Sequence, residues 1–265
     1  MNLKNRPPVA LTIAGSDPSG GAGLQADLKT FHQHGTYGMS VVTLLTVQNT
    51  QTVTAVRLMD AEFVSAQLDC VLADIPPHAA KVGALGSSEL IQLVATKANA
   101  FTFPLVIDPV MISKHGLPLI DDAAVGSLRT SLLPRAYLAT PNRFEAAAIT
   151  GRRVESVNDF VEAAKALQDF GAQHVLIKGL VEDHQSRDLL WSNGEATWFT
   201  ETKIDTRHTH GSGCVYAAAI TAHLACGESL FRAVEQAKLF ISKAIRTAPE
   251  LGQGRGPVNM FAAVR

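Results

Sequence analysis

The run Val9-Ala-Leu-Thr-Ile-Ala14, which ends directly in Gly15-Ser-Asp-Pro-Ser-Gly-Gly-Ala-Gly23, predicts a buried strand followed by a glycine-rich loop. Apolar residues at Leu24, Leu28 and Phe31 then recur at helical spacing. The next apolar run, residues 39–47, is rich in β-branched residues and apolar on both faces, as in a strand inside a parallel sheet. A strand, a helix and a second strand in this order predict an α/β fold.

The same alternation continues along the chain. We expect further strands at residues 79–82, 104–108, 136–139 and 174–178, and an additional extended segment at 52–56. Helices are expected at residues 24–34, 61–72, 88–97, 121–133, 142–150, 157–170, 213–225 and 229–247. Residues 188–191 and 196–199, separated by Ser-Asn-Gly-Glu, predict a small β hairpin. The pattern therefore predicts a mostly parallel central sheet with helices on both faces, in a single domain over residues 1–265, because no linker interrupts it.

Composition narrows the class of protein. A net charge of -1 and a pI of about 6.8 provide no long-range attraction for nucleic acid or an anionic membrane. No apolar run reaches the roughly 20 residues needed to cross a bilayer, and the N-terminus lacks the apolar centre of a signal peptide. Three cysteines are too few and too odd in number for a disulfide framework, and we expect Cys70 and Cys226 to be core residues. The composition indicates a cytoplasmic, reduced protein that binds neither nucleic acid nor membrane.

A polar, glycine-containing loop precedes the penultimate helix and reads Asp205-Thr-Arg-His-Thr-His-Gly211-Ser212-Gly213-Cys214. Glycines let backbone N–H groups point inward, and a helix N-terminus carries partial positive charge, so this loop suits an anion. A thiol in such a place is expected to lose its proton more easily than a free cysteine. His208 and His210 lie in the same loop without a matching ligand cluster, so we interpret them as loop structure rather than metal ligands.

Other polar residues follow expected strands, where ligands of open α/β sheets bind. Asp108 and Glu145 are a plausible carboxylate pair for Mg²⁺, although Asn142 with Glu145 also matches a helix capping box. Lys178 could reach nucleotide phosphates or be a solvated strand end. The amide of Gln48 could recognise an amino-heterocycle or bond the backbone.

Two common nucleotide-binding motifs are disfavoured. Gly21-Ala-Gly23-Leu-Gln-Ala26 matches the dinucleotide fingerprint, but residues 41–50 contain no acidic residue to hold a ribose hydroxyl. The loop also lacks the Gly-Lys-Ser/Thr ending of a P-loop. A nicotinamide dehydrogenase and a Walker-type NTPase are therefore poor interpretations.

Taken in order, these motifs resemble one known family. They are Ala-Gly-Ser-Asp-Pro-Ser-Gly-Gly-Ala-Gly at 14–23, Gln-Asn-Thr at 48–50, Asp-Pro-Val-Met at 108–111, Thr-Pro-Asn-x-x-Glu at 140–145, Lys-Gly at 178–179 and Thr-His-Gly-Ser-Gly-Cys at 209–214. The chain resembles the hydroxymethylpyrimidine/phosphomethylpyrimidine kinases of thiamin synthesis, in the ribokinase superfamily, over essentially its whole length. The resemblance implies a ribokinase-like fold, ATP and Mg²⁺ as cofactors, and transfer of the γ-phosphoryl group to 4-amino-5-hydroxymethyl-2-methylpyrimidine and then to its monophosphate.

The resemblance also implies residue roles and a homodimer. Gln48 would bind the pyrimidine, near Gly15, Asp27, Ala84 and Val110. Asp108 and Glu145 would organise Mg²⁺, and Lys178, Asn142 and Thr209 would lie on the nucleotide side. Gly211, Ser212 and Gly213 would form the anion hole. Cys214 would stand where most members of the superfamily place an aspartate base, either accepting the hydroxymethyl proton or only orienting the hydroxyl.

Two positions depart from the family pattern. Lys81-Val-Gly83-Ala84 replaces the usual Lys-x-Gly-Met, which shortens a side chain expected against the pyrimidine. Leu180 stands in place of the second glycine of Lys-Gly-Gly-His, which would alter the phosphate loop. Loss of one packing side chain is worth about 1–3 kcal/mol, enough to change substrate preference. Phosphorylation of pyridoxal or pyridoxine, or a catalytically weakened pyrimidine-binding regulator, therefore stay open as alternatives.

Overall fold

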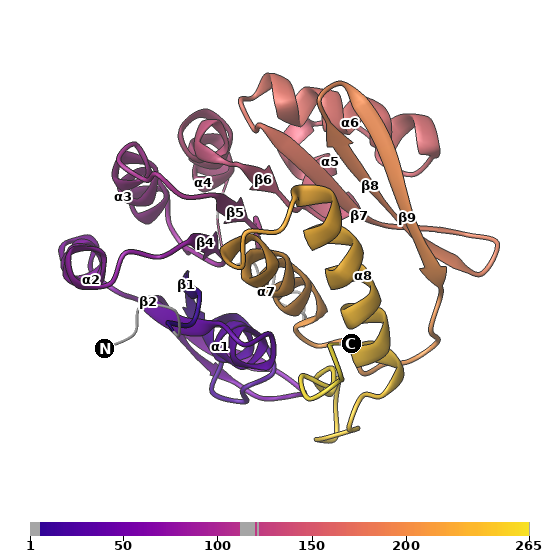
Figure 1. The fold of residues 1–265 in the computed structure, drawn as a ribbon, viewed down its shortest axis with the longest axis horizontal. Helices are drawn as coiled ribbons and strands as arrows, with labels where there is room; N and C mark the ends of the chain where they lie inside the picture. Colours follow the sequence, from indigo (N-terminus) through magenta and orange to yellow (C-terminus); the bar gives the residue numbers. More distant parts are fainter. Residues whose placement is uncertain (1–5, 112–119, 121, 265) are drawn as a thin grey trace.

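The computed structural model describes residues 6–111, 120 and 122–264. Within these residues nine strands form one sheet, in the order β3-β2-β1-β4-β5-β6-β7-β8-β9 (Figure 1). The pairs from β2 through β1 to β4, β5, β6 and β7 are parallel, whereas β2–β3, β7–β8 and β8–β9 are antiparallel. The strands are β1 (Val9–Ser16), β2 (Tyr37–Gln48), β3 (Val53–Leu58), β4 (Ala79–Val82), β5 (Leu105–Ile107), β6 (Leu138–Ala139), β7 (His174–Glu182), β8 (Gln185–Ser192) and β9 (Glu195–Thr202).

Helices cover both faces of this sheet, as predicted (Figure 1). One face carries α2 (Ala61–Asp74), α3 (Ser88–Ala98), α4 (Asp122–Ser127), α5 (Arg143–Thr150) and α6 (Val157–Asp169). The other carries α1 (Gly23–Gln33), α7 (Ser212–Ala225) and α8 (Leu230–Arg246). Alternate residues of each strand contribute to two separate cores, since Leu11 and Ile13 pack with the first helix layer and Ala10 with the second.

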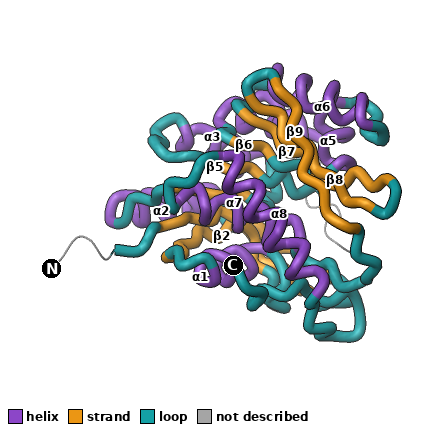
Figure 2. Tube along the Cα trace, turned by 45° about the vertical axis from the view of Figure 1, so that its right-hand side comes forward, coloured by secondary structure: helices purple, strands orange, loops and turns teal. Residues whose placement is uncertain are grey.

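The C-terminal part of the sheet is more antiparallel than the sequence indicated. The strand expected at residues 174–178 continues to Glu182 and pairs with β8, so β7, β8 and β9 form two consecutive hairpins (Figure 2). Gly179 has a φ of 92°, and the β7–β8 register shifts between Ile177 and Leu180. Lys178, followed by Gly179, was expected to end the strand. Gly179 instead accommodates a bulge within it.

The helix expected at residues 121–133 is interrupted. Its first residue, Asp121, lies outside the described residues. The helix α4 ends at Ser127 and is followed by a π-helical segment, Leu128–Leu132, and a 3₁₀ turn, Leu133–Arg135. Pro134 has no N–H to continue the α-helical bonding, so the chain changes its winding before it reaches β6.

The placement of two cysteines differs from expectation. Cys70 and Cys226 are both exposed, so the prediction that they are core residues is wrong. In α2 only Val64 and Leu68 are buried, and Cys70 lies off that face; Cys226 is the C-cap of α7. Apolar neighbours in the sequence did not distinguish the buried stripe of a helix from its outer face. None of the helices in the described ranges is both long and apolar enough to span a membrane.

Candidate functional site

A cavity of about 600 Å³ lies at the C-terminal ends of the central strands. Its walls come from the loops after β1, β4, β5 and β6, from β2, β7 and β8, and from α7 and α8. Segments far apart in the sequence meet here because parallel strands end at the same edge of the sheet. All but one of the predicted site residues line it: Gly15, Gln48, Ala84, Asp108, Val110, Asn142, Glu145, Lys178, Thr209, Gly211, Ser212, Gly213 and Cys214.

The glycine turn at the start of α7 forms one wall. Gly211 is the N-cap of α7 with a φ of 73°, and a Cβ at this position would lie 1.8 Å from the carbonyl oxygen of Gly21. Only glycine fits both the backbone conformation and this close approach. A Cβ on Gly213 would lie 3.7 Å from Nζ of Lys178 and 3.8 Å from a carboxylate oxygen of Asp108. The N-terminus of a fourteen-residue helix is therefore aimed at the region between a lysine and a carboxylate.

Asp108 and Lys178 form a largely buried ion pair in the cavity wall. Nζ of Lys178 lies 2.9 Å from Oδ1 of Asp108, and the Thr140 hydroxyl donates to the same oxygen over 3.2 Å. Burial alone would raise the pKa of the Asp108 carboxyl, but Lys178 and Lys81 bring this pKa below its ordinary value. Asp108 is therefore a carboxylate at neutral pH.

Glu145 takes the capping role that the sequence allowed, and its place in the cavity is compatible with the expected metal role. Its carboxylate accepts the N–H of Asn142 over 2.8 Å in a capping box, and it also lines the cavity. Burial, together with the negative charge of Asp108, raises the pKa of Glu145 to about 8. With this pKa Glu145 is largely protonated at neutral pH beside the ionised Asp108, and a cation bound to both side chains would favour its ionised form.

This donor set suits Mg²⁺. The ion keeps much of its water and takes one or two carboxylates from a protein. Among the described residues no cluster of three or more His, Cys, Asp or Glu side chains could form an all-protein metal cage. Asp108 and Glu145 match the sparser arrangement.

Cys214 lies in the first turn of α7 and lines the cavity, but its acidity differs from our prediction. Burial raises the pKa of its thiol to about 11, although Lys81 and the N–H of Gly23 act in the opposite direction. Asp27 and Asp108 add negative charge nearby and raise this pKa further. The expectation of a readily ionised thiol is therefore wrong, because desolvation outweighs the opposing effects of Lys81 and the Gly23 N–H.

Asp27 is the one predicted site residue that the structure places behind the cavity wall. Both of its carboxylate oxygens lie 2.8 Å from Nζ of Lys81, the Thr12 hydroxyl donates to it over 2.6 Å, and the ion pair is fully buried. Lys81 itself reaches the cavity. This lysine was noted in the sequence only as part of a motif, and its pairing across 54 positions carries no local signal.

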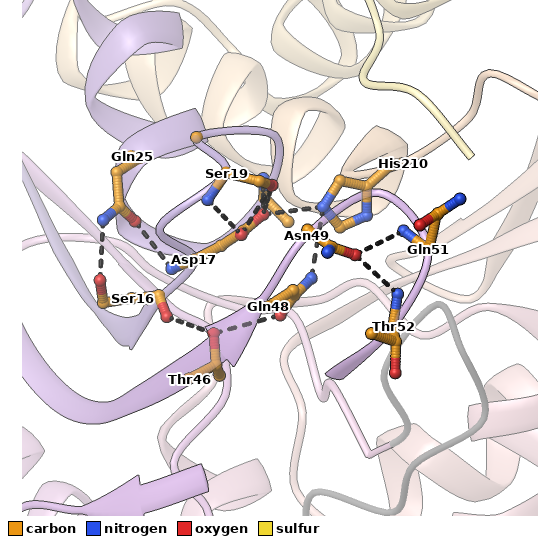
Figure 3. A network of polar contacts seen from close by, with 12 residues as sticks. Ser16, Asp17, Ser19, Gln25, Thr46, Gln48, Asn49, Gln51, Thr52 and His210 are labelled. Atoms are coloured by element: carbon orange, nitrogen blue, oxygen red, sulfur yellow. Dashed lines mark hydrogen bonds and ion pairs between the residues drawn. The ribbon is translucent and has the colours of Figure 1, made fainter. Parts of the chain in front are cut away.

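A second polar group joins the first glycine loop to the loop before α7 (Figure 3). Nε2 of His210 lies 2.7 Å from Oδ2 of Asp17, and the Gln48 amide nitrogen lies 3.4 Å from the same Nε2. All three residues line the cavity. His208 does form loop structure, since its Nδ1 accepts the N–H of Gly256 over 3.2 Å. His210 was also interpreted as loop structure, and the structure adds a place for it in the cavity wall.

The cavity is also lined by residues of β8 and α8 that the sequence did not indicate. Nζ of Lys238 lies 2.7 Å from Oδ2 of Asp188, and both side chains are buried. Ala84 also lines the cavity, as the departure from the family motif implied. Leu180 does not; it is a core residue within β7, so the expected effect on a phosphate loop is not supported.

Comparison with known proteins identifies the family. The family model for phosphomethylpyrimidine kinase matches residues 17–259. The hydroxymethylpyrimidine/phosphomethylpyrimidine kinase of Synechococcus elongatus is 44% identical over 256 residues, covering 96% of this chain and 97% of the relative. The protein of the same name from Bacillus subtilis is 44% identical over 259 residues, covering 97% and 96%.

Solved structures agree in fold. An ADP complex of Bacillus subtilis pyridoxal kinase is 38% identical with a TM-score of 0.90, covering 97% of this chain and 98% of that one. The pyridoxal kinase from Staphylococcus aureus in complex with AMP-PCP and pyridoxal is 36% identical with a TM-score of 0.89, covering 97% and 95%. The phosphomethylpyrimidine kinase from Clostridium difficile is 40% identical with a TM-score of 0.79, covering 89% and 99%. With its ribokinase-like fold and a cavity lined by the predicted kinase residues, the chain belongs to the phosphomethylpyrimidine kinase family and is a nucleotide-binding phosphotransferase.

Proposed function

We propose that the protein transfers the γ-phosphoryl group of ATP to 4-amino-5-hydroxymethyl-2-methylpyrimidine, and then to its monophosphate, in thiamin biosynthesis. One observation carries the proposal: a single cavity holds the Gly211–Cys214 turn, the Asp108–Lys178 pair and the Gln48 amide. These are an anion-binding turn, a charged centre for phosphates and a donor–acceptor group for a heterocycle. Curated relatives at 44% identity carry the names of both activities.

The acceptor pyrimidine would bind beside Gln48. Gly15, Ala84 and Val110 offer apolar or small surface in the same cavity, and Gln48 offers one hydrogen-bond donor and one acceptor toward an aminopyrimidine edge. Asp27 would act on this site through Lys81, since it does not reach the cavity.

The nucleotide would bind at the side of Lys178, Asn142 and Thr209. The Lys178 ammonium can hold phosphate oxygens as a point charge, and Asp108 and Glu145 would hold Mg²⁺. When bound, Mg²⁺ neutralises phosphate charge and orients the phosphates for in-line transfer.

The turn at residues 211–214 would receive the transferring phosphoryl group. Backbone N–H groups at the start of α7 stabilise charge on the equatorial oxygens, which suits the loose transition state of phosphoryl transfer. Cys214 would contact the hydroxymethyl oxygen of the acceptor. With a pKa of about 11 the thiol is protonated at neutral pH, so it orients the hydroxyl, and it becomes a base only if bound ligands lower this pKa.

Coupled ADP release tests this function. The assay compares the pyrimidine alcohol, its monophosphate, pyridoxal and no acceptor at fixed ATP and Mg²⁺. We expect turnover with both pyrimidines and little with pyridoxal. Efficient turnover of pyridoxal would instead favour vitamin B6 as substrate, and tight pyrimidine binding without turnover would favour a regulator.

We also propose that the chain is one domain over residues 1–265 that forms a homodimer. All nine described strands share one sheet, and β2 and β3 expose the side chains of Leu45, Val47 and Leu58. Exposed apolar side chains on a sheet edge favour pairing with a second copy. Light scattering after size exclusion tests the dimer: a monomeric mass at micromolar concentration would contradict it.

A further inference from the structure

Residues 252–258 follow α8 near the C-terminus (yellow in Figure 1) and contact the two loops that carry Gln48 and Gly211, although they do not line the cavity. The first contact is with the turn after Gln48. The N–H of Arg255 donates to the carbonyl oxygen of Thr50 over 2.8 Å, and the N–H of Gly254 donates to the Thr50 hydroxyl over 3.2 Å. The segment therefore bonds the turn directly beside the amide that would recognise the heterocycle.

The second contact is with the loop that leads into α7. The N–H of His210 donates to the carbonyl oxygen of Gly256 over 3.1 Å, and the N–H of Val258 donates to the carbonyl oxygen of His210 over 3.3 Å. The N–H of Gly256 also donates to Nδ1 of His208 over 3.2 Å. Because His210 directly precedes Gly211, the same segment holds the start of the anion-binding turn.

Glycine at position 254 is required by the close approach to the Gln48 turn. A Cβ on Gly254 would lie 2.0 Å from the carbonyl oxygen of Thr50 and 2.9 Å from Cα of Gln51. The φ of Gly254 is outside the left-handed region, so its backbone conformation alone would admit other residues. A Cβ on Gly252 would likewise lie 2.3 Å from the hydroxyl oxygen of Thr50. The two segments thus pack backbone against backbone, across 204 positions of sequence.

We infer that residues 252–258 form a clamp that fixes the spacing between the Gln48 turn and the Gly211–Cys214 turn, and thereby the distance from the acceptor hydroxyl to the transferring phosphoryl group. The inference rests on the proposed function, in which these two turns hold the acceptor and the phosphoryl group. In-line transfer depends on the placement of the attacking oxygen, and a misplacement of about 1 Å can lower the rate about a hundredfold. Gly254 and Thr50 are positioning residues, since neither lines the cavity.

The first test is Gly254→Ala, with Gly126→Ala as the matched control. A Cβ on Gly126, in α4, would have no atom within 4 Å, and its φ is also outside the left-handed region. In Gly254→Ala we expect kcat/KM for the pyrimidine alcohol to fall at least about tenfold, through both kcat and KM, while KM for ATP changes less than about twofold. Gly126→Ala should match the wild type. Unchanged acceptor kinetics in a folded Gly254→Ala, or equal losses for acceptor and ATP, would overturn the inference.

A milder pair of variants tests the same contact without a steric clash. Thr50→Val removes the hydroxyl that accepts the N–H of Gly254 and keeps the shape of the side chain, whereas Thr50→Ser keeps the hydroxyl. We expect Thr50→Val to lower kcat/KM for the acceptor by about two- to tenfold, the usual effect of one lost hydrogen bond, and Thr50→Ser to stay close to the wild type. Equal acceptor kinetics in the two variants would contradict the role of this bond.

Hydrogen–deuterium exchange measures the clamp without turnover. Peptides that contain residues 48–52 and 208–211 should exchange faster in Gly254→Ala than in the wild type, whereas peptides of α3 should not change. Unchanged exchange in both loops would overturn the inference and leave the kinase assignment intact. Turnover of pyridoxal in place of the pyrimidine would overturn the proposed function alone. Pyridoxal would then be the acceptor in the same comparison, with the same expected difference between acceptor and ATP.

Discussion

Alkylation of Cys214 by iodoacetamide should show that its thiol is held protonated by burial. Only the thiolate reacts, so the rate at a given cysteine rises about tenfold per pH unit until the pH reaches its pKa. With a pKa of about 11, roughly one molecule in a thousand carries the Cys214 thiolate at pH 8. The difference from an ordinary thiol corresponds to about 3 kcal/mol against the charged form.

The assay is mass spectrometry of the alkylated protein between about pH 7 and pH 10, with circular dichroism to verify that the fold persists. Cys70 and Cys226 are exposed and act as internal references for the reagent in the same sample. The shape of the pH profile separates acidity from access, because a narrow cavity slows the reaction equally at every pH. We expect the Cys214 rate to rise throughout this range without a plateau.

A plateau below about pH 8 would refute the reasoning, since it would show that the helix N-terminus and Lys81 outweigh desolvation. The same measurement with ATP, Mg²⁺ and the pyrimidine bound tests whether these ligands lower the pKa of Cys214 enough for its thiolate to act as a base. In parallel, Cys214→Ala should lower kcat by about ten- to a hundredfold while changing acceptor affinity much less. Equal turnover in that variant would remove Cys214 from the mechanism.

Four further outcomes follow from the geometry. Gly211→Ala should abolish turnover, because its Cβ would lie 1.8 Å from a carbonyl oxygen. The control Gly227→Ala also has a positive φ, 82°, but its Cβ would enter open space, so it should lower the free energy of unfolding in urea by only about 1 kcal/mol. Lys81→Met should destabilise the fold by about 3–5 kcal/mol, because it leaves the buried Asp27 without its ion-pair partner. The double variant Asp27→Leu with Lys81→Met should recover most of this loss. Equal urea-unfolding midpoints for the single and the double variant would contradict this expectation. Lys178→Met removes the lysine of the cavity ion pair and should reduce kcat/KM for ATP by about a hundredfold. The control Lys165→Met removes an exposed lysine and should leave kcat/KM unchanged. Burial lowers the pKa of His34 to about 4. The stability that depends on neutral His34, at most about 3 kcal/mol, is therefore present above about pH 6.5 and is lost as the pH falls toward 4. A His34→Phe variant should lose less stability than the wild type between pH 6.5 and pH 4 in unfolding titrations.

Local sequence pattern predicted the elements well where burial is periodic. The strand at residues 79–82 has the predicted limits, and α3 and α7 each differ by one residue from the predicted ranges. The capping box of Asn142 and Glu145 was visible as a spacing of three residues. Such features depend on neighbours within a few positions, which the sequence displays directly.

The candidate site was predictable as a set of residue types but not as a set of contacts. Predicted strand ends identified Gln48 and Asp108 because parallel strands share one edge. Lys178 was chosen by the same reasoning and lines the cavity, although it lies within β7 beside a bulge. The pairing of His210 with Asp17 spans 193 positions, and that of Lys81 with Asp27 spans 54, so neither leaves a local signal.

The amino-acid sequence by itself determined the α/β alternation, the glycine turns and the kinds of side chain available at the strand ends, because these follow from local geometry and periodicity. Only the tertiary structure decided which charges are buried together. It moved Asp27 behind the cavity wall, kept the Cys214 thiol protonated and placed His210 against Gln48. The physical reason is that desolvation and Coulomb interactions depend on the distance through space and on the exclusion of water, and neither quantity is defined until the chain has packed.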